Sequence, residues 1–356
     1  MTTNRLTCIF FIAAIALFPI CILHAEGNKT DNIESPYGVL AFLSWDHEWN
    51  NNHYSKEKLT QAVSLMKEAG IDWVRMDFLW GDIEPEKGNF VFEKYDYIVN
   101  LLRASNINIL GILEYNPNWR KATWNAAPER ELYVLYAGQV VEHFKDRVKH
   151  WEVWNEPDDK TYWEPQDRME AYSRLLKDTY TVLKVIDPEC KVVMGGVSMT
   201  IAVSLDRIYK NAGKEYFDIV NVHPFVNPLL PNRVQILQGI YQGIRRVMKK
   251  HGDADKDIWF TELGSPGVKE PDKNNGWWMG ISPTRGQQAR WLTQAYSVAL
   301  KFKGVKKIFW AFFRDTIDHF HNGVDSFGLV EEDFTPKPSF EAYKKMTREK
   351  ITTPEK

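Results

Sequence analysis

Short hydrophobic runs alternate with amphipathic stretches along the chain after residue 36, and the alternation occurs eight times. The stretch before Gly70, for example, has Leu59, Ala62, Val63 and Met66 on one helical face. Strands that alternate with helices predict a parallel sheet covered by helices. The expected strands are 37–43, 73–78, 107–113, 151–154, 191–194, 217–222, 258–261 and 307–312. The expected helices are 58–69, 95–104, 132–148, 169–185, 234–250 and 288–302.

Two of these runs end in a polar pair whose second residue is a glutamate. Residues 151–157 run from Trp151 into Asn155, Glu156 and a proline, and residues 257–264 run into Thr261 and Glu262. A hydrophobic run that stops at a polar pair is typical of a buried strand delivering side chains to a cleft, so we expect strand four to stop at Glu156.

The two glutamates are 106 positions apart, which is about 35 residues for each of three βα units and close to the roughly 31 of a ~250-residue barrel. The fold class predicted is therefore α/β, a single (β/α)8 TIM barrel over residues 37–350. No internal repeat or interdomain linker interrupts that range. Because active sites of such barrels lie where the strands end, both glutamates should meet at one face.

The N-terminus carries Arg5 and then an apolar run from Leu6 to Leu23. This pattern predicts a secretory signal peptide over residues 1–25 with cleavage after Ala25, followed by a linker over 26–36. The expected location is periplasmic or extracellular. Leu23 is a poor residue for the −3 position of that cut, so a retained membrane anchor facing outward is the alternative.

Composition narrows the range of partners. The net charge of −2 and the pI near 6.5 offer no general attraction for nucleic acid. Fourteen Trp and fifteen Tyr suit a carbohydrate-binding cleft, although for any single Trp a place in the core is the expected one. Cleavage of the signal would leave Cys190 as the one cysteine, so neither an intramolecular disulfide nor a thiol-ligated metal site is expected.

The ordered motifs resemble glycoside hydrolase clan A, through Asn155-Glu156-Pro157 and the later Thr261-Glu262. Residues 74–77, 327–329 and 336–338 are similar to family 39-like bacterial enzymes, a group that includes β-xylosidases and an endoglycosidase branch that cleaves exopolysaccharide. The resemblance spans nearly the whole chain after the signal.

The resemblance implies a role for each matched residue. Glu156 would be the acid/base, Glu262 the nucleophile, and Asn155 the residue that binds the sugar 2-hydroxyl. His223 matches the strand-six histidine, and Trp310 matches the strand-eight tryptophan that forms the floor of a subsite. One departure stands out: many clan members carry a tyrosine just after that histidine, and Phe225 takes its place here.

Arg75, within strand two, could keep Glu262 ionised or could form an interior salt bridge with Glu152. Glu156 has to be protonated to act as an acid, and we expect burial and the charge of Glu262 to raise its pKa. Glu114, at the end of strand three, is the alternative acid.

Aromatic residues after the strands are further candidates for sugar contacts, namely Trp45, Trp119 and Trp278. Residues 314–325 are rich in Asp and His, and we expect a polar substrate rim there. We expect no metal ion and no cofactor, because retaining hydrolysis requires only the two carboxyl groups.

The function predicted is a secreted retaining glycoside hydrolase that acts on a β-linked poly- or oligosaccharide. Two alternatives stay open: an exo-acting enzyme like the β-xylosidases, and a catalytically silent carbohydrate-binding barrel. The expected partner is carbohydrate, with membrane contact only through a retained N-terminal segment. The sequence does not indicate the sugar, its linkage, or the oligomeric state.

Overall fold

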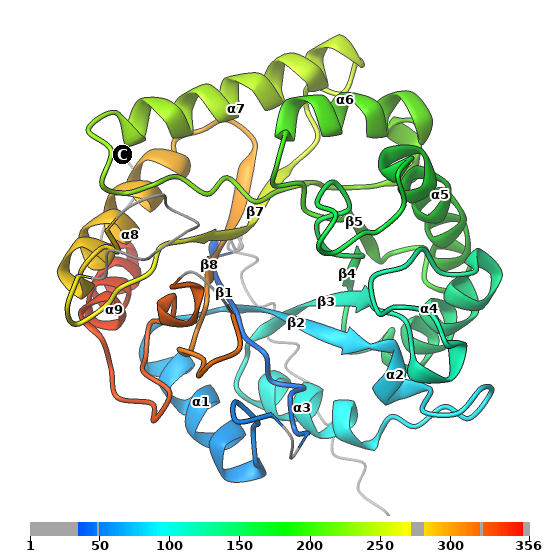
Figure 1. Cartoon of the computed structure of the whole chain (residues 1–356), viewed down its shortest axis with the longest axis horizontal. Coiled ribbons are helices and arrows are strands. Elements are labelled where there is room, and N and C mark those ends of the chain that lie inside the picture. Colours follow the sequence, from blue (N-terminus) through cyan, green and yellow to red (C-terminus); the bar gives the residue numbers. More distant parts are fainter. Residues whose placement is uncertain (1–34, 48–49, 272–280, 321–322, 352–356) are drawn as a thin grey trace, which may run out of the picture. The chain divides into compact units, whose positions relative to one another are not determined.

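The computed structural model describes residues 35–47, 50–271, 281–320 and 323–351 (Figure 1). The predicted signal peptide, most of the predicted linker and Trp278 lie outside these residues. None of the helices in the described ranges combines the length and the apolar character needed to cross a bilayer.

Eight parallel strands form one sheet with the order β5-β4-β3-β2-β1-β8-β7-β6. Bridges from Val193 to Ile219 and from Val197 to Val222 join its two edges, so the sheet closes into a barrel. The predicted (β/α)8 fold is confirmed. The strands are β1 (Tyr37–Leu40), β2 (Trp73–Leu79), β3 (Asn108–Glu114), β4 (His150–Val153), β5 (Lys191–Met194), β6 (Val220–Val222), β7 (Ile258–Gly264) and β8 (Val305–Ala311).

A helix follows each strand on the outside of the barrel (Figure 1). The helices in order are α1 (Lys56–Glu68), α3 (Glu93–Ala104), α4 (Arg130–Phe144), α5 (Arg168–Ile186), α6 (Ile201–Asn211), α7 (Arg233–Lys250), α8 (Arg285–Ala299) and α9 (Pro338–Ile351). The one-turn helix α2 (Trp80–Ile83) directly follows β2. Sequence reasoning missed α2, α6 and α9. The last begins at Pro338, a residue that suits the first position of a helix because its missing N–H needs no partner there.

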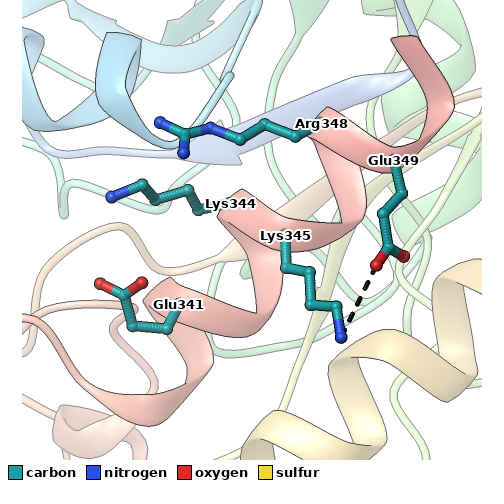
Figure 2. A pocket seen from close by; sticks show the side chains of 5 residues that line it. All are labelled: Glu341, Lys344, Lys345, Arg348 and Glu349. Atoms are coloured by element: carbon teal, nitrogen blue, oxygen red, sulfur yellow. Dashed lines mark ion pairs between the residues drawn. The ribbon is translucent and has the colours of Figure 1, made fainter. Parts of the chain in front are cut away.

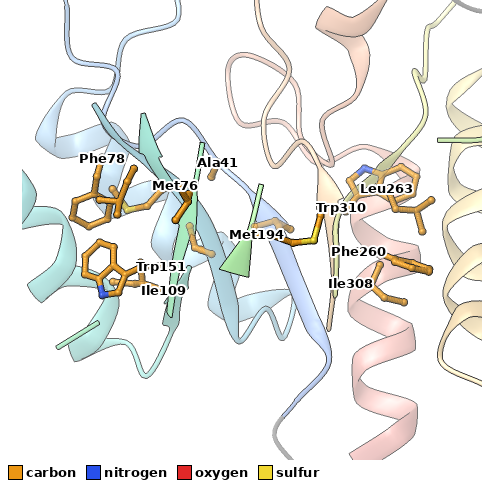
Figure 3. Close-up of a cluster of buried hydrophobic side chains, with 14 of the residues drawn as sticks. Ala41, Met76, Phe78, Ile109, Trp151, Met194, Phe260, Leu263, Ile308 and Trp310 are labelled. Atoms are coloured by element: carbon orange, nitrogen blue, oxygen red, sulfur yellow. The ribbon is translucent and has the colours of Figure 1, made fainter. Parts of the chain in front are cut away.

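Side-chain alternation along the strands separates two apolar layers. Trp73, Leu110, Val193, Ile219, Trp259 and Phe309 pack together inside the barrel and close its lower part. The intervening residues pack outward against the helices, and Figure 3 shows part of this outer layer, including Ile308 and Trp310. The inward-facing side chains of the strands become polar toward the carboxyl ends.

Candidate active site

Arg75 connects the two strands that carry the predicted catalytic residues. Its Nη1 donates to Oε1 of Glu262 at 2.6 Å. Its Nε and Nη2 donate to the carboxylate of Glu152 at 2.7 and 2.9 Å, and Nη2 also donates to Oδ1 of Asn155 at 2.9 Å. Both roles foreseen for Arg75 are therefore present together: an interior ion pair with Glu152 and a contact to Glu262.

The segment that carries Glu156 is a strained turn and not the end of a strand. Strand β4 stops at Val153, one residue before the end of the expected strand 151–154 and three residues before Glu156, where we expected the strand to stop. Trp154 and Glu156 both have positive φ, at 65° and 39°, a conformation that costs roughly 1–3 kcal/mol for each residue other than glycine. The indole of Trp154 donates to the carbonyl of Tyr162 at 2.8 Å, and Asp159 N donates to the carbonyl of Glu156 at 3.0 Å. These bonds hold the turn that directs Glu156 into the barrel mouth.

His223, from the end of β6, lies between the two glutamates. Its Nδ1 is 2.7 Å from Oε1 of Glu156 and 3.7 Å from Oε1 of Glu262. Its Nε2 is 2.9 Å from the hydroxyl of Thr261. A Cβ on Gly196 would overlap the imidazole ring, so the glycine after β5 is required for the histidine to fit.

The two glutamates are close together and almost fully buried. One carboxylate oxygen of Glu156, one of Glu262 and a ring nitrogen of His223 lie within 4.8 Å of one another. Glu156 is 7% exposed and Glu262 is 9% exposed. The prediction that two strand ends bring these carboxyl groups to one place agrees with the structure.

The surroundings of Glu156 favour its neutral form. Burial raises its pKa to about 8, and the charges of Asp158 and Asp159 add to the effect. A hydrogen bond with Ser198 and the charge of Arg75 act in the opposite direction. The direction is the expected one, but the main charges responsible come from the residues just after Glu156 and not from Glu262.

The same surroundings shift the pKa values of Glu262 and His223 in opposite directions. The pKa of Glu262 is raised overall, mainly by burial and also by the charge of Glu156, while the charge of Arg75 and the hydrogen bond from Arg75 offset part of that rise. Burial lowers the pKa of His223, which makes the imidazole neutral. Because Arg75 donates a hydrogen bond to Glu262 and none is recorded to Glu156, the site favours a charge on Glu262 and a proton on Glu156.

A second pair of carboxyl groups lies inside the barrel on two neighbouring strands. Asp77 on β2 and Glu114 on β3 share a hydrogen bond, and burial raises the pKa of each. Two carboxyl groups that hydrogen-bond to each other need a proton between them. Glu114, the alternative acid, is thus engaged with Asp77.

Among the residues that the structure describes, two groups have the donor atoms of a metal site. One is Glu156, His223 and Glu262, where Arg75 already donates to a carboxylate. The other is Asp46, His47 and Asp82, where the ammonium of Lys94 lies 2.8 Å from Asp46 and 2.5 Å from Asp82. In both groups a protein cation supplies positive charge to the carboxylates.

The predicted aromatic contacts fall in different places. The indole of Trp45 donates to Asp77 at 3.2 Å, which holds this ring at the barrel mouth. Trp119 donates to the carbonyl of Glu84 at 2.8 Å and packs edge-on against Trp80. Trp278 lies outside the described residues. The assignment of sugar contacts to these three residues stays a prediction.

Trp310 does not fit the predicted subsite floor. Its side chain is 0% exposed and its indole donates to the carbonyl of Phe327 at 3.0 Å. The neighbouring Phe309 points into the barrel, so strand alternation turns Trp310 outward into the layer shown in Figure 3.

Sequence reasoning missed two residues beside Glu156. Asp158 accepts hydrogen bonds from the backbone N–H of Ser198 at 3.0 Å and from the Ser204 hydroxyl at 2.9 Å, and so joins the Glu156 turn to the start of α6. The carbonyl of Tyr162 accepts from the indole of Trp154, and burial raises the pKa of the Tyr162 hydroxyl, with the charges of Glu156 and Glu262 adding to the rise. Tyr162 is thus a candidate for the tyrosine hydroxyl that Phe225 lacks. Asp158 and Tyr162 follow Asn155-Glu156 closely in the chain, and this position is the sequence feature that could have identified them.

The hollow in Figure 2 is a separate surface feature on α9. It has a volume of about 340 Å³ and is lined by Glu341, Lys344, Lys345, Arg348 and Glu349. Lys345 pairs with Glu349 at 3.6 Å, and Lys344 pairs with Glu68 at 2.5 Å. No strand-end residue lines this hollow, so it is not part of the candidate active site.

Comparison with known sequences gives short or distant matches. The family model of glycoside hydrolase family 42, described as beta-galactosidase, matches residues 48–113. Avenacosidase 2 from Avena sativa is 31% identical over 166 residues, which are 41% of this chain and 28% of the relative. Endo-1,4-beta-xylanase B from Thermotoga neapolitana is 21% identical over 318 residues, which are 85% of this chain and 87% of the relative. The chain spans about a third or less of the first four curated relatives.

Solved structures match over most of the barrel. A family 39 glycoside hydrolase from Bacteroides cellulosilyticus WH2 has a TM-score of 0.68 at 20% identity and covers 88% of this chain and 63% of its own. A GH39 beta-xylosidase from Caulobacter crescentus has a TM-score of 0.68 at 19% identity, with 88% and 71% covered. These likenesses show the fold, and together with the family 42 match they confirm the resemblance to clan A glycoside hydrolases.

Proposed function

We propose that this chain is a retaining glycoside hydrolase that cleaves a β-linked poly- or oligosaccharide by double displacement. The observation that carries the proposal is the buried pair Glu156 and Glu262, which bring one carboxylate oxygen each to within 4.8 Å of the other. Retaining enzymes hold their two carboxyl groups ~5–5.5 Å apart, whereas inverting enzymes need ~6.5–9.5 Å to admit a water molecule. The spacing therefore favours retention.

In the first step Glu262 attacks the anomeric carbon while Glu156 gives its proton to the leaving oxygen. The glycosidic C–O bond breaks, an ester bond forms to Glu262, and the leaving sugar departs as an alcohol. Arg75 supports this step because its hydrogen bond at 2.6 Å favours the ionised nucleophile. The raised pKa of Glu156, about 8, supports its role as the proton donor.

In the second step Glu156 takes a proton from water, and the water oxygen displaces Glu262 from the anomeric carbon. Formation of the ester removes the charge of Glu262 beside Glu156, which lowers the pKa of Glu156 and suits it to act as a base. The sugar is released with its original configuration, and both carboxyl groups return to their starting states.

Asn155 is suited to bind the sugar. Its Oδ1 accepts from Arg75 at 2.9 Å, so its amide group is fixed with the NH2 directed away from the guanidinium. A fixed NH2 donor on the residue next to Glu156 supports the role that the resemblance gives to Asn155, a contact to the sugar 2-hydroxyl.

Known relatives support a β-glycoside as the substrate. Their names describe a beta-xylosidase, an endo-1,4-beta-xylanase and beta-galactosidases. An exo-acting β-xylosidase-like specificity is the second candidate, supported by the GH39 beta-xylosidase structures from Caulobacter crescentus. We also propose export of the protein, on the apolar run from Leu6 to Leu23 and the small residue Ala25.

A substrate panel tests the proposed activity. It contains aryl β-glycosides, plant β-glycans and microbial exopolysaccharides, with wild type compared with the variants Glu156→Gln and Glu262→Gln. Turnover should fall by at least about a hundredfold in both variants. The matched control is Glu142→Gln, which changes an exposed glutamate paired with Lys145 and should keep full activity. A wild-type protein that binds sugars without turning any over would be a carbohydrate-binding barrel instead.

A further inference from the structure

Trp124 is an exposed tryptophan in the segment between β3 and α4. Its side chain is 47% exposed, and no other tryptophan stands among the exposed large apolar side chains in the described ranges. Burial of a large aromatic ring contributes strongly to the free energy of folding, and a ring that stays half exposed contributes only part of it. An exposed ring that is also held rigidly is prepared to bind a ligand.

Neighbouring aromatic rings fix the orientation of Trp124. Its ring lies edge-on to Tyr115, with centroids 4.9 Å apart at 86°, and to Tyr162, with centroids 6.2 Å apart at 72°. Tyr115 in turn lies edge-on to Trp154 at 5.3 Å. The ring is therefore held by two near-perpendicular ring contacts, and the contact through Tyr115 leads to Trp154 in the strained turn before Glu156.

The backbone of the Trp124 loop is also held in place. Buried Asn116 donates from its backbone N–H to the carbonyl of Trp124 at 3.0 Å. Its side-chain amide donates to the carbonyls of Thr123 at 3.1 Å and Ala126 at 2.6 Å. Three carbonyls around the tryptophan thus accept from one buried residue, through its backbone N–H and its side-chain amide, which limits movement of the loop.

Further hydrogen bonds join this loop to the segment that follows Glu156. Asn125 donates to the carbonyl of Thr161 at 3.0 Å, and Glu164 N donates to the carbonyl of Asn125 at 3.0 Å. The Thr123 hydroxyl donates to the carboxylate of Glu164 at 3.1 Å. Trp124 and the acid/base segment therefore form one connected unit.

Tyr162 connects the exposed ring to the catalytic pair. Its ring contacts Trp124, and its carbonyl accepts at 2.8 Å from the indole of Trp154, two residues before Glu156, while the charges of Glu156 and Glu262 raise the pKa of its hydroxyl. In the proposed mechanism Glu156 protonates the leaving oxygen. Trp124 and Tyr162 pack against the segment that carries Glu156, so they lie on the leaving-group side of the bond that breaks.

We propose that Trp124, together with Tyr162, forms a subsite that stacks against a pyranose ring of the leaving group. The apolar C–H face of a pyranose suits the exposed indole, and the tyrosine hydroxyl offers a polar contact at the inner end. This inference rests on the proposed glycosidase function and deepens it. It implies a substrate whose leaving group is itself a sugar chain, and so favours cleavage within an oligo- or polysaccharide.

Paired substrates separate this subsite from the chemistry. The probes are the β-xylosyl, β-glucosyl, β-galactosyl and β-mannosyl fluorides, whose leaving group is a fluoride ion, and the matching β-1,4-linked tetrasaccharides. In Trp124→Ala, kcat/KM for the tetrasaccharide should fall about five- to fiftyfold more than kcat/KM for the fluoride. Trp124→Phe should recover part of the difference because it restores an aromatic face. Leu135→Ala removes an apolar side chain that is 50% exposed on α4, and it should change neither substrate.

The outcomes distinguish this subsite from the proposed activity itself. If wild type hydrolyses no fluoride and no tetrasaccharide, the glycosidase proposal fails. If wild type hydrolyses fluorides but no tetrasaccharide, or if Trp124→Ala lowers both substrates equally, the leaving-group subsite is wrong while the glycosidase proposal stands. Calorimetry of tetrasaccharide binding to Glu262→Gln, with and without Trp124→Ala, checks the same contact without turnover. Equal affinity in those two proteins would also overturn the subsite.

Discussion

Nδ1 of His223 lies 2.7 Å from Oε1 of Glu156, and burial favours the neutral form of both groups. A hydrogen bond between two neutral groups at this distance contains one proton. The Thr261 hydroxyl donates to Oδ1 of Asn221 at 2.7 Å, so its oxygen accepts from Nε2 of His223 at 2.9 Å. The ring proton of His223 is therefore on Nε2, and the shared acidic proton belongs to Glu156.

This arrangement predicts the tautomer of His223. Nitrogen NMR of ¹⁵N-labelled protein at neutral pH should show Nε2 protonated and Nδ1 unprotonated, and Glu156→Gln should keep that tautomer because the amide can donate to Nδ1. A proton on Nδ1 in the wild-type protein would mean that Glu156 is the acceptor, and the proposed acid would then be ionised at rest.

The pH dependence of activity should follow Glu156. Its pKa is raised to about 8 by burial and then by the charges of Asp158 and Asp159, so kcat/KM should fall as the pH rises through about 8. Asp158→Asn removes one of those charges and should move this alkaline limb to lower pH. Asp255→Asn removes an exposed charge elsewhere and is the control. An unmoved limb in Asp158→Asn would leave that residue with only its structural role at the start of α6.

Stability should depend on pH through the same carboxyl group. In the unfolded chain Glu156 titrates near its ordinary value of 4.5, whereas in the folded protein it keeps its proton up to about pH 8. Its contribution to stability is therefore fully present below pH 4.5 and is lost as the pH rises through 8. Glu156→Gln should be similar to wild type at pH 4.5 and more stable at pH 9, by roughly 2–4 kcal/mol. Urea unfolding at the two pH values measures the difference, and equal stability at pH 9 would refute the raised pKa.

Removal of the acid should affect substrates according to their leaving groups. Glu156→Ala should slow hydrolysis of unactivated oligosaccharides by about 10²–10⁴-fold, because their leaving oxygen needs a proton. Glycosylation by dinitrophenyl glycosides should change much less, since that leaving group departs as a stable anion, and the alkaline limb should vanish. Pre-steady-state kinetics separates the two steps. Equal slowing of glycosylation for both substrates, with the limb retained, would direct the search for the acid to Glu114.

The eight strands and both glutamates were predictable from the sequence for a physical reason. Strands of a parallel barrel are buried on both faces, so they read as continuous apolar runs, and the polar residue that ends each run marks the functional face. Glu156 and Glu262 were found in this way, whereas Arg75 was found as a charged residue within an apolar run. The bounds of the strands were less predictable, because the change at Trp154 from extended backbone to positive φ has no counterpart in residue type.

Residues that depend on strand register or on contacts between loops could not be predicted. A shift of one residue decides whether Trp310 or Phe309 faces the barrel interior, and a hydrophobic run that contains both does not reveal which. Tyr162 and Trp124 come together through hydrogen bonds between two loops that are far apart in the chain. These hydrogen bonds between loops form only in the closed barrel, and no local sequence pattern predicts them.

The anomeric configuration of the product formed with azide tests the assignment of the two glutamates most directly. In Glu262→Gly, azide fills the place of the missing nucleophile and should restore turnover of a dinitrophenyl β-glycoside, giving the glycosyl azide of inverted configuration. In Glu156→Ala, azide should instead attack the ester formed on Glu262 and give the azide of retained configuration. Proton NMR of the two products distinguishes these results. An inverted azide from Glu156→Ala, or no rescue of a folded, sugar-binding Glu262→Gly, would contradict the assignment of Glu262 as nucleophile and Glu156 as acid/base.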